Sequence, residues 1–308
     1  MENNWIFEKM KITITGASGF VGLNLYDYLK NNHEIETLSA RFLPDQEFKL
    51  ETNAVIHLAG KAHDLKRISK PSDYYEANFE LTKQLFDSFL NSDTEVFIFM
   101  SSVKACADKV ERILVESNNS EPKTHYGISK LQAEQYILSK TLPVGKRIYI
   151  LRPCMIHGPG NKGNLNLLYQ IVNKRIPWPL GAFNNQRSFL SIENLCFTIN
   201  ELLQNKNISG GIYQVADDEP ISTNELIEII GVSLGKKSKI LKVSERIINK
   251  IANLGNYLPL PLNSERLQKL TENYVVSNEK IKKALRKELP ISTKQGLFKT
   301  IESFTRSK

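Results

Sequence analysis

Hydrophobic side chains in the first half of the chain follow two spacings in turn. The segment Lys11–Thr15 alternates β-branched residues and runs directly into a glycine, which predicts a strand that feeds a tight turn. From Gly19 to Asn31 apolar residues recur on one helical face, so this segment predicts an amphipathic helix. The compact apolar run Ala54–Leu58 predicts a strand that is buried on both faces.

The same alternation continues further along the chain. We predict helices over Asp73–Leu90 and Tyr126–Lys140, and strands over Ile35–Leu38, Val96–Met100 and Arg147–Leu151. Strands separated by helices are typical of βαβ units and a parallel sheet. The predicted fold class is therefore α/β, with a Rossmann-like doubly wound parallel sheet and a smaller, mixed C-terminal part.

The pattern of residue types changes after Pro153. Prolines, glycines and asparagines between Pro177 and Asn185 predict irregular loops, and Ser222 begins a capping box in front of an apolar helix. We divide the chain into an N-terminal part over residues 10–155 and a C-terminal part over residues 156–308. We expect the two parts to be interleaved.

Composition narrows the class of protein. The 308 residues are 41% hydrophobic and 24% charged, which is typical of globular chains, and no window approaches 18 uninterrupted apolar residues. The N-terminal stretch lacks the apolar segment of a secretory signal. Cys106, Cys154 and Cys196 are spaced neither as a disulfide framework nor as a metal site, which favours reduced thiols. We expect a cytoplasmic protein without a transmembrane segment.

The net charge of +8 is concentrated towards the C-terminus. Residues 231–308 hold 17 Lys and Arg against 6 Asp and Glu. A solvated basic surface accounts for this excess, and two sharper explanations stay open: attraction of a polyanionic substrate and peripheral contact with anionic lipid. Nucleic acid is not an expected partner, because stacking aromatic residues are not interleaved with the basic ones.

A glycine-rich turn follows the first strand. The segment Thr15–Gly22 places glycines between strand and helix at the spacing with which backbone amides and a helix N-terminus bind a pyrophosphate. We predict a dinucleotide site here, which makes residues 10–155 the NAD(P)-binding part and residues 156–308 the substrate-binding part. The residues predicted to contact the cofactor in this turn are Gly16, Ser18, Gly19, Phe20, Val21 and Gly22.

The segment Thr37–Arg41 bears on which dinucleotide binds. It lacks the carboxylate that holds the ribose of NAD at the end of the second strand. Ser39 and Arg41 suit a 2′-phosphate instead, so we favour NADP, with NAD as the alternative.

Tyr126 and Lys130 lie four residues apart, on one face of a predicted helix. The pKa of a free tyrosine is near 10. A neighbouring ammonium and the positive nicotinamide of an oxidised cofactor both favour the phenolate, so Tyr126 is expected to exchange a proton with a substrate hydroxyl during hydride transfer. Ser102 ends the strand before this helix and is expected to donate a hydrogen bond to the developing alkoxide.

These elements, in this order, resemble the extended short-chain dehydrogenase/reductase family, the NAD-dependent epimerase/dehydratase group, over essentially the whole chain. The segments that carry the resemblance further are Ala54–Gly60, Glu76–Glu80, Leu151–Pro153, His157–Gly160 and Gln186–Leu195. The resemblance implies a catalytic triad of Ser102, Tyr126 and Lys130, a nucleotide-sugar substrate, and a homodimer to which Tyr126–Lys140 contributes a helix. It adds Leu58, Ala59, Gly60, Asn78 and Pro153 to the cofactor site, to which Tyr126 and Lys130 also belong. It implies His63, Lys104, Asn164 and Arg187 as substrate ligands, with Arg187 on the diphosphate.

The residues after Ser102 separate this chain from the dehydratases of the group. An Asp-Glu pair follows the catalytic hydroxyl in those enzymes, whereas Val103 and Lys104 stand here and cannot take those acid and base roles. The segments Met100–Lys104, Gly158–Asn164 and Trp178–Gly181 resemble a bacterial branch of enzymes for surface polysaccharides.

These residues are compatible with three functions. We predict reduction of the 4-keto group of a UDP-linked 2-acetamido-2,6-dideoxy hexose. The alternative is 4-epimerisation of UDP-glucose or UDP-N-acetylglucosamine, which uses the same residues. An alternative from another class is a non-catalytic NAD(P)-binding regulatory protein, which the presence of both Tyr126 and Lys130 disfavours.

Several reactive side chains have no assigned role. Cys106 and His157 replace residues that are usual in the family, and Trp178 suits either sugar stacking or a buried loop anchor. The histidines are far apart and lack companions at ligand spacing, so no metal site is expected.

Overall fold

The structure is a computed structural model, and it describes residues 8–62, 70–161, 165–258 and 262–306. Two predicted substrate ligands, His63 and Asn164, lie outside these ranges.

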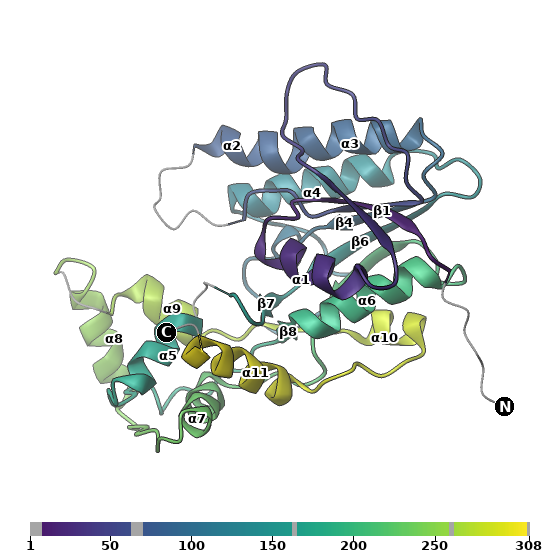
Figure 1. Cartoon of the computed structure of the whole chain (residues 1–308). Coiled ribbons are helices and arrows are strands. Elements are labelled where there is room, and N and C mark those ends of the chain that lie inside the picture. The colour runs from purple at the N-terminus through teal and green to yellow at the C-terminus, as the bar shows by residue number, and fades with distance from the viewer. Residues whose placement is uncertain (1–7, 63–69, 162–164, 259–261, 307–308) are drawn as a thin grey trace.

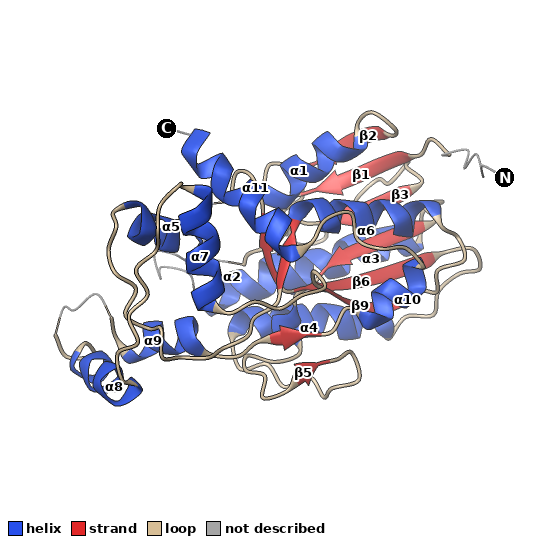
Figure 2. Cartoon of the chain, turned by 90° about the horizontal axis from the view of Figure 1, so that it is seen from below, coloured by secondary structure: helices blue, strands red, loops and turns tan. Residues whose placement is uncertain are grey.

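Within the described ranges, six strands form one parallel sheet in the order β2-β1-β3-β4-β6-β9 (Figures 1 and 2). The strands are β1 (Lys11–Thr15), β2 (Glu34–Leu38), β3 (Ala54–His57), β4 (Val96–Met100), β6 (Arg147–Pro153) and β9 (Gly211–Val215). From β1 the chain moves outward to β2 and then returns to the other side of β1 as β3. Ligands of open α/β sheets bind at such a switch point, beyond the carboxyl ends of the strands.

Helices cover both faces of the sheet, because central strands such as β4 bury apolar side chains on both faces. Side chains of α1 (Phe20–Leu29), α6 (Ile192–Gln204) and α10 (Glu279–Leu285) pack with one set of strand residues. Those of α3 (Leu81–Leu90) and α4 (His125–Leu138) pack with the other set, and Figure 1 shows these two helices above the sheet. This confirms the predicted doubly wound sheet.

The predicted helix over Asp73–Leu90 is confirmed, and it has one wide turn in its middle. The segment is α2 (Pro71–Tyr75), the π-helical turn η1 (Glu76–Glu80) and then α3. Asn78 lies in the π turn with its side chain fully buried and hydrogen-bonded. A single wide turn of this kind is common at functional sites, and periodicity does not reveal it.

The rest of the C-terminal half, apart from β9, α6 and α10, forms a second lobe, which lies at the lower left of Figure 1. Its elements are β7 (Met155–His157), paired with β8 (Phe189–Ser191), and the helices α5 (Leu165–Asn173), α7 (Thr223–Ser233), α8 (Glu245–Leu254), α9 (Ser264–Thr271) and α11 (Thr293–Arg306). They surround their own apolar cluster. The predicted capping box is confirmed, since Ser222 and Glu225 each bond the other's backbone amide at the start of α7.

Two short elements join the lobe to the sheet part. Residues Val275–Val276 form β10, which pairs in parallel with β5 (Ile113–Leu114). No helix in the described ranges has both the length and the apolarity needed to cross a bilayer.

Candidate active site

The glycine turn after β1 is packed closely against neighbouring backbone atoms. Gly16 has a φ of 67°, and a Cβ built there would lie 2.7 Å from the backbone nitrogen of Ala59. At Gly22 a Cβ would lie 2.4 Å from the carbonyl oxygen of Gly16, so side chains are excluded where helix and turn meet. Gly19 caps α1 without a side-chain hydrogen bond. This leaves a cradle of backbone amides at a helix N-terminus, which fits the pyrophosphate of a dinucleotide.

The other predicted residues of this turn have different exposures. Ser18 is exposed, whereas Phe20 and Val21 are half-buried in the first turn of α1. The ring of Phe20 lies under the loop after β7, because a Cβ at Gly158 would come within 3.4 Å of it.

A cavity of about 540 Å³ opens beside the switch point. Its lining residues include Arg41, Ala59 and Gly60. All three are predicted to contact the cofactor, and a shared cavity is what that prediction requires. Two carboxylates, Asp73 and Glu76, also line it, and Asp73 is paired with Lys61 at 2.7 Å. The charge in this cavity is therefore mixed, which the local sequence after β2 did not reveal.

Asn78 ties the loop after β3 to helix α4. Its amide oxygen accepts the Lys61 backbone N–H at 2.8 Å, and its amide nitrogen donates to Lys61 O and to Ser129 Oγ, both at 3.0 Å. A Cβ at Gly60 would lie 2.6 Å from Asn78 Oδ1 and 3.2 Å from Lys130 Nζ. The predicted cofactor residues Gly60, Asn78 and Lys130 therefore lie together, next to Leu58 and Ala59.

The first turn of helix α4 packs closely against the loop that follows β4. Thr124 accepts the Gly127 backbone N–H at 3.2 Å, and a Cβ at Gly127 would lie 2.3 Å from the carbonyl oxygen of Lys104. This close approach brings Tyr126 to Ser102. Burial raises the pKa of Tyr126, and its hydrogen bond with Ser102 acts in the opposite direction.

Lys130 is directed towards the sheet. Its Nζ donates to the carbonyl oxygen of Met100 at 2.8 Å, and burial lowers its pKa to about 8 against the opposing charge of Glu134. The lowered Tyr126 pKa expected from a neighbouring ammonium is not found. The effect of burial on the phenol is the larger one, and the ammonium is engaged with the β4 backbone.

The sequence analysis missed a buried polar network behind these residues. Glu134 accepts hydrogen bonds from Ser101 Oγ and, in a bidentate pair, from Arg152 at 2.5 Å and 3.0 Å. Both charged side chains are at most 3% exposed, and Arg152 also reaches Ser120 Oγ at 3.2 Å. Spacing offered one signal: Glu134 follows Lys130 by four residues, on the same face of α4.

The predicted substrate residues Lys104 and Arg187 form a cationic cluster with two carboxylates beside it, those of Asp108 and Glu272, and Glu272 lies 3.9 Å from Arg187. Lys104 Nζ donates to Asp108 O at 2.8 Å and lies 4.3 Å from the centre of the Tyr274 ring. Burial lowers the Lys104 pKa, and Arg187 and Lys269 lower it further, against two carboxylates. Arg187 donates to the carbonyl oxygen of Lys269.

Other residues singled out in the sequence have structural partners. Pro153 is buried opposite Val215, and Cys106 is fully buried. His157 is also fully buried, with Nδ1 2.9 Å from Thr300 Oγ1, so it connects β7 to α11. Trp178 is buried and donates to Asn224 Oδ1 at 3.0 Å, which makes it a loop anchor.

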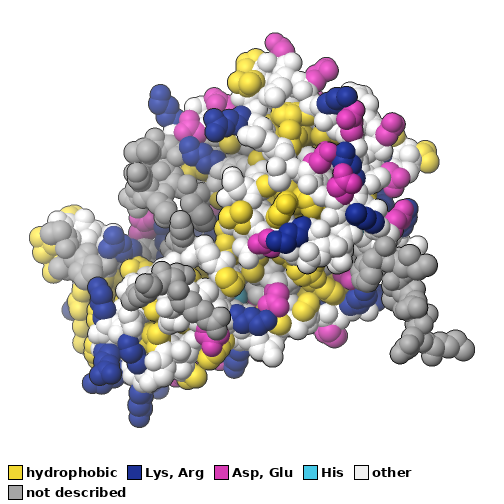
Figure 3. Space-filling view, viewed as in Figure 1, with side chains coloured by type: hydrophobic (Ala, Val, Ile, Leu, Met, Phe, Trp, Pro, Cys, Tyr) yellow, Lys and Arg dark blue, Asp and Glu magenta, His cyan; other side chains and the backbone are white. Residues whose placement is uncertain are grey.

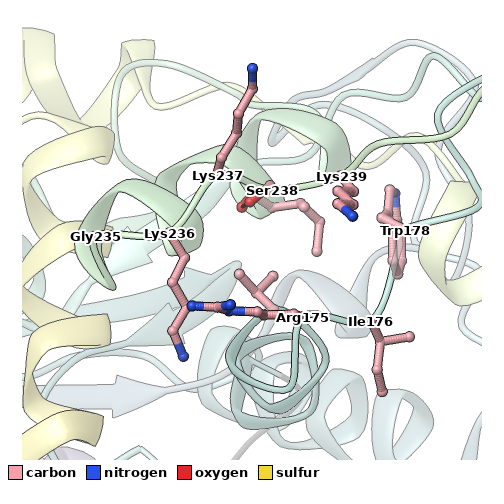
Figure 4. Close-up of a pocket in the computed structure, with 10 residues that line it drawn as sticks. Arg175, Ile176, Trp178, Gly235, Lys236, Lys237, Ser238 and Lys239 are labelled. Carbon is pink, nitrogen blue, oxygen red and sulfur yellow. Dashed lines mark hydrogen bonds between the residues drawn. The ribbon is translucent and has the colours of Figure 1, made fainter.

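A second cavity, of about 300 Å³, lies in the lobe and contains none of the predicted site residues. Figure 4 shows it between the end of α5 and the loop after α7, with Trp178 at one side. Four cationic side chains line it, those of Arg175, Lys236, Lys237 and Lys239. It is distinct from the crevice at the switch point.

A doubly wound sheet with a glycine cradle at its switch point, and a Ser–Tyr–Lys set beside the same crevice, defines the class of dinucleotide-dependent α/β enzymes. Within this class, the sequence pattern of the NAD dependent epimerase/dehydratase family matches residues 12–216. The chain belongs to that family.

Relatives of known name include both epimerases and reductases. The chain is 28% identical over 325 residues to the UDP-glucose 4-epimerase of Vibrio cholerae, covering 95% of each chain. It is 26% identical over 241 residues to the GDP-6-deoxy-D-mannose reductase of Pseudomonas aeruginosa, covering 71% of this chain and 79% of that one. The fold matches the structure of RMD from Pseudomonas aeruginosa complexed with NADPH, with a TM-score of 0.74, 23% identity and coverage of 97% and 100%.

Proposed function

We propose that this protein reduces the 4-keto group of a UDP-linked 2-acetamido-2,6-dideoxy hexose, with NADPH as the hydride donor. The observation that carries the proposal is the pairing of the Tyr126 and Ser102 hydroxyls beside Gly60 and Lys130, at the crevice that holds the glycine cradle. Relatives of this chain include an enzyme named as a reductase of a deoxysugar nucleotide.

The chain's own groups have complementary tasks in this reaction. The nicotinamide, when bound, supplies a hydride to C4 of the sugar. Ser102 accepts the Lys104 backbone N–H at 3.2 Å, and its own O–H, which bonds Tyr126 in this structure, would turn to donate to the C4 oxygen of a bound sugar. Tyr126 gives its phenolic proton to that oxygen as it becomes an alkoxide, so hydride and proton together convert ketone to alcohol.

Substrate anchoring is proposed for the cationic cluster of Lys104 and Arg187. Their charges lie close enough to influence each other, which suits two adjacent phosphates of a nucleotide diphosphate. We propose that His63 and Asn164 contact the sugar directly.

Arg41 supports the choice of NADP. It lines the same cavity as Ala59 and Gly60, and β2 ends at Leu38 with no carboxylate among residues 39–44. A guanidinium is suited to a 2′-phosphate because it is planar and permanently charged.

The second candidate function is 4-epimerisation of UDP-glucose or UDP-N-acetylglucosamine. It is favoured by the similarity to the Vibrio cholerae 4-epimerase over nearly the whole of both chains. Tyr126 would first take a proton from the 4-hydroxyl and later return one, and no reduced cofactor would leave the enzyme.

One experiment separates the candidates. The purified protein is incubated with UDP-N-acetylglucosamine alone, and separately with the UDP-linked 4-keto-6-deoxy sugar plus NADPH or NADH. Oxidation of NADPH only with the keto sugar is the expected result. Formation of the galacto epimer without added cofactor would overturn the reductase assignment, and cofactor binding without turnover of either sugar would favour the regulatory protein.

We also propose that the protein is a cytoplasmic homodimer. Its three cysteines are buried as free thiols, which suits a reducing compartment. Helix α4 is a proposed interface element, and sedimentation equilibrium would test the dimer.

A further inference from the structure

Helix α8, at the outer end of the lobe, carries apolar side chains on two faces. Ile248 and Ala252 face inward and belong to the lobe's apolar cluster. A second row faces solvent, and with the turn that follows the helix it consists of Ile247, Ile251, Leu254, Tyr257 and Leu258, which we call the α8 stripe. These side chains are between 43% and 88% exposed. Three of them recur at i, i+4 and i+7, so they form one continuous strip along the helix.

The α8 stripe lies within a strongly basic segment of the chain. From Val232 to Leu258 the chain has six Lys and Arg and one acidic residue, Glu245. The six are Lys236, Lys237, Lys239, Lys242, Arg246 and Lys250. None of them forms an ion pair with another described residue. Figure 3 shows the combination as yellow side chains at the outer edge of the lobe with dark blue ones beside and below them.

We propose that the α8 stripe docks on an anionic lipid bilayer, with its apolar side chains entering the interfacial region and the exposed cations contacting lipid headgroups. Lys236 is not one of these, because its Nζ donates to Asn173. An apolar face flanked by Lys and Arg on a helix that does not span the bilayer is the arrangement of interfacial helices. Anionic headgroups are the complementary charge for an unpaired local excess of +5. Three of the cations, Lys236, Lys237 and Lys239, also line the lobe cavity of Figure 4.

The same charge argues against a second copy of this chain as the occupant. A two-fold interface places the same patch of both subunits in contact. Two surfaces with this basic excess would then face each other with no described acidic side chain paired to either. A bilayer carries the opposite charge and imposes no such repulsion.

The docking surface is close in the fold to the proposed substrate site. Helix α8 packs on α9, and the carbonyl oxygen of Lys269 in α9 accepts a hydrogen bond from Arg187. One helix therefore separates the α8 stripe from the cationic cluster at the substrate end of the crevice.

The test is co-sedimentation of the full chain with vesicles of phosphatidylcholine alone and with equal parts of phosphatidylcholine and phosphatidylglycerol. We expect binding to the anionic vesicles only, and loss of binding in 1 M salt, where the screening length falls to about 3 Å. Binding to neither vesicle, or equal binding to both, would overturn the proposal.

Two variants locate the surface. The double variant Ile251→Asp/Leu254→Asp changes exposed side chains only and is expected to abolish vesicle binding with an unchanged thermal unfolding midpoint. The matched control is Leu23→Asp on α1, which is similarly exposed and should bind as the unmodified chain does. Arg246→Gln/Lys250→Gln should weaken binding by about 30-fold, since each cation near an anionic surface contributes about 1 kcal/mol. Unchanged vesicle binding by Ile251→Asp/Leu254→Asp, with a fall in molar mass by light scattering, would show an interface between copies and overturn the proposal.

Discussion

Tyr126 has a protonation preference that matters for the direction of the reaction. Burial raises its pKa and outweighs the hydrogen bond with Ser102, so the phenol keeps its proton near neutral pH. A protonated phenol is ready to donate to a developing alkoxide, as reduction of a ketone requires. Epimerisation starts with proton removal instead and depends more strongly on the positive nicotinamide to favour the phenolate.

Replacing Tyr126 by Phe should therefore remove the proton donor and leave the cofactor cradle intact. We expect turnover of the nucleotide sugar to fall about 100- to 10,000-fold, the range of general acid–base catalysis, while the Kd for NADPH changes far less because the glycine cradle still binds it. Steady-state turnover and cofactor fluorescence titration measure the two quantities. Tyr136→Phe is the matched control on the same helix, since its hydroxyl bonds Asp87 at 2.6 Å; comparable turnover in the two variants would remove Tyr126 from its role.

Lys130 should leave a signature in the pH dependence of stability. Its pKa is about 8 in the folded chain and 10.5 ordinarily, so below pH 8 it is protonated in both folded and unfolded chains. Between pH 8 and 10.5 the unfolded chain binds the extra proton, and the free energy of unfolding should rise by up to about 1.4 kcal/mol per pH unit. Denaturant titrations across this range should show the rise in wild type relative to Lys130→Met. A flat difference between wild type and Lys130→Met would contradict the lowered pKa.

Arg41 is the residue proposed to favour NADPH over NADH. Arg41→Ala should weaken NADPH binding about tenfold or more, because a charge-assisted hydrogen bond to a phosphate is lost, and should leave NADH binding unchanged. Parallel fluorescence titrations with the two cofactors measure the ratio. An equal loss for both would mean that Arg41 does not contact the 2′-phosphate.

At the scale of elements, the position of α4 depends on groups that lie behind the reacting side chains. Glu134 binds Ser101 at the end of β4 and Arg152 in β6, so one buried carboxylate connects the helix to two neighbouring strands. Breaking a buried ion pair by removing one charge is far more damaging than breaking an exposed one.

Glu134→Gln should lower the free energy of unfolding by about 3–5 kcal/mol, because the Arg152 guanidinium stays buried without its counter-charge. Chemical denaturation measures the change. Glu193→Gln removes the partner of Lys299 in an exposed pair and should change stability by less than about 1 kcal/mol. Similar small changes in both variants would show that the Glu134 pair does not hold α4 in place.

Local pattern predicted the elements well and their long-range contacts poorly. The bounds of β1 and β4 could be predicted because alternating or continuous apolar residues meet polar ones at both ends. The π turn at Glu76–Glu80 could not, since the contacts of Asn78 with Lys61 and Ser129 involve residues remote in sequence. The Glu134–Arg152 pair was missed for the same reason, although the glycine cradle and the Tyr126–Lys130 spacing were legible locally.

At the scale of the molecule, the residues of the proposed active site come from both the sheet part and its border with the lobe. The glycine cradle and Tyr126 belong to the sheet, whereas Arg187 lies between the lobe and the sheet and is bridged to residues 221 and 274. Cofactor and nucleotide sugar are thus proposed to contact different parts of the fold.

Hydrogen exchange should separate these two contacts. NADPH should slow amide exchange over residues 16–22 and 58–61, and UDP should slow it over residues 185–188 and 269–274, because each ligand orders the backbone it touches. Mass spectrometry of peptic fragments measures both. Protection of the same peptides by the two ligands would contradict a divided site.

The edge strand β9 has a consequence for how the chain is made. It pairs with β6 along Tyr149–Pro153, yet about sixty residues separate the two strands in sequence. During synthesis β6 therefore leaves the ribosome long before its neighbour, with one row of backbone donors and acceptors open to other nascent chains. Fragments that stop short of Val215 should consequently aggregate rather than fold, even though they retain every glycine of the cradle.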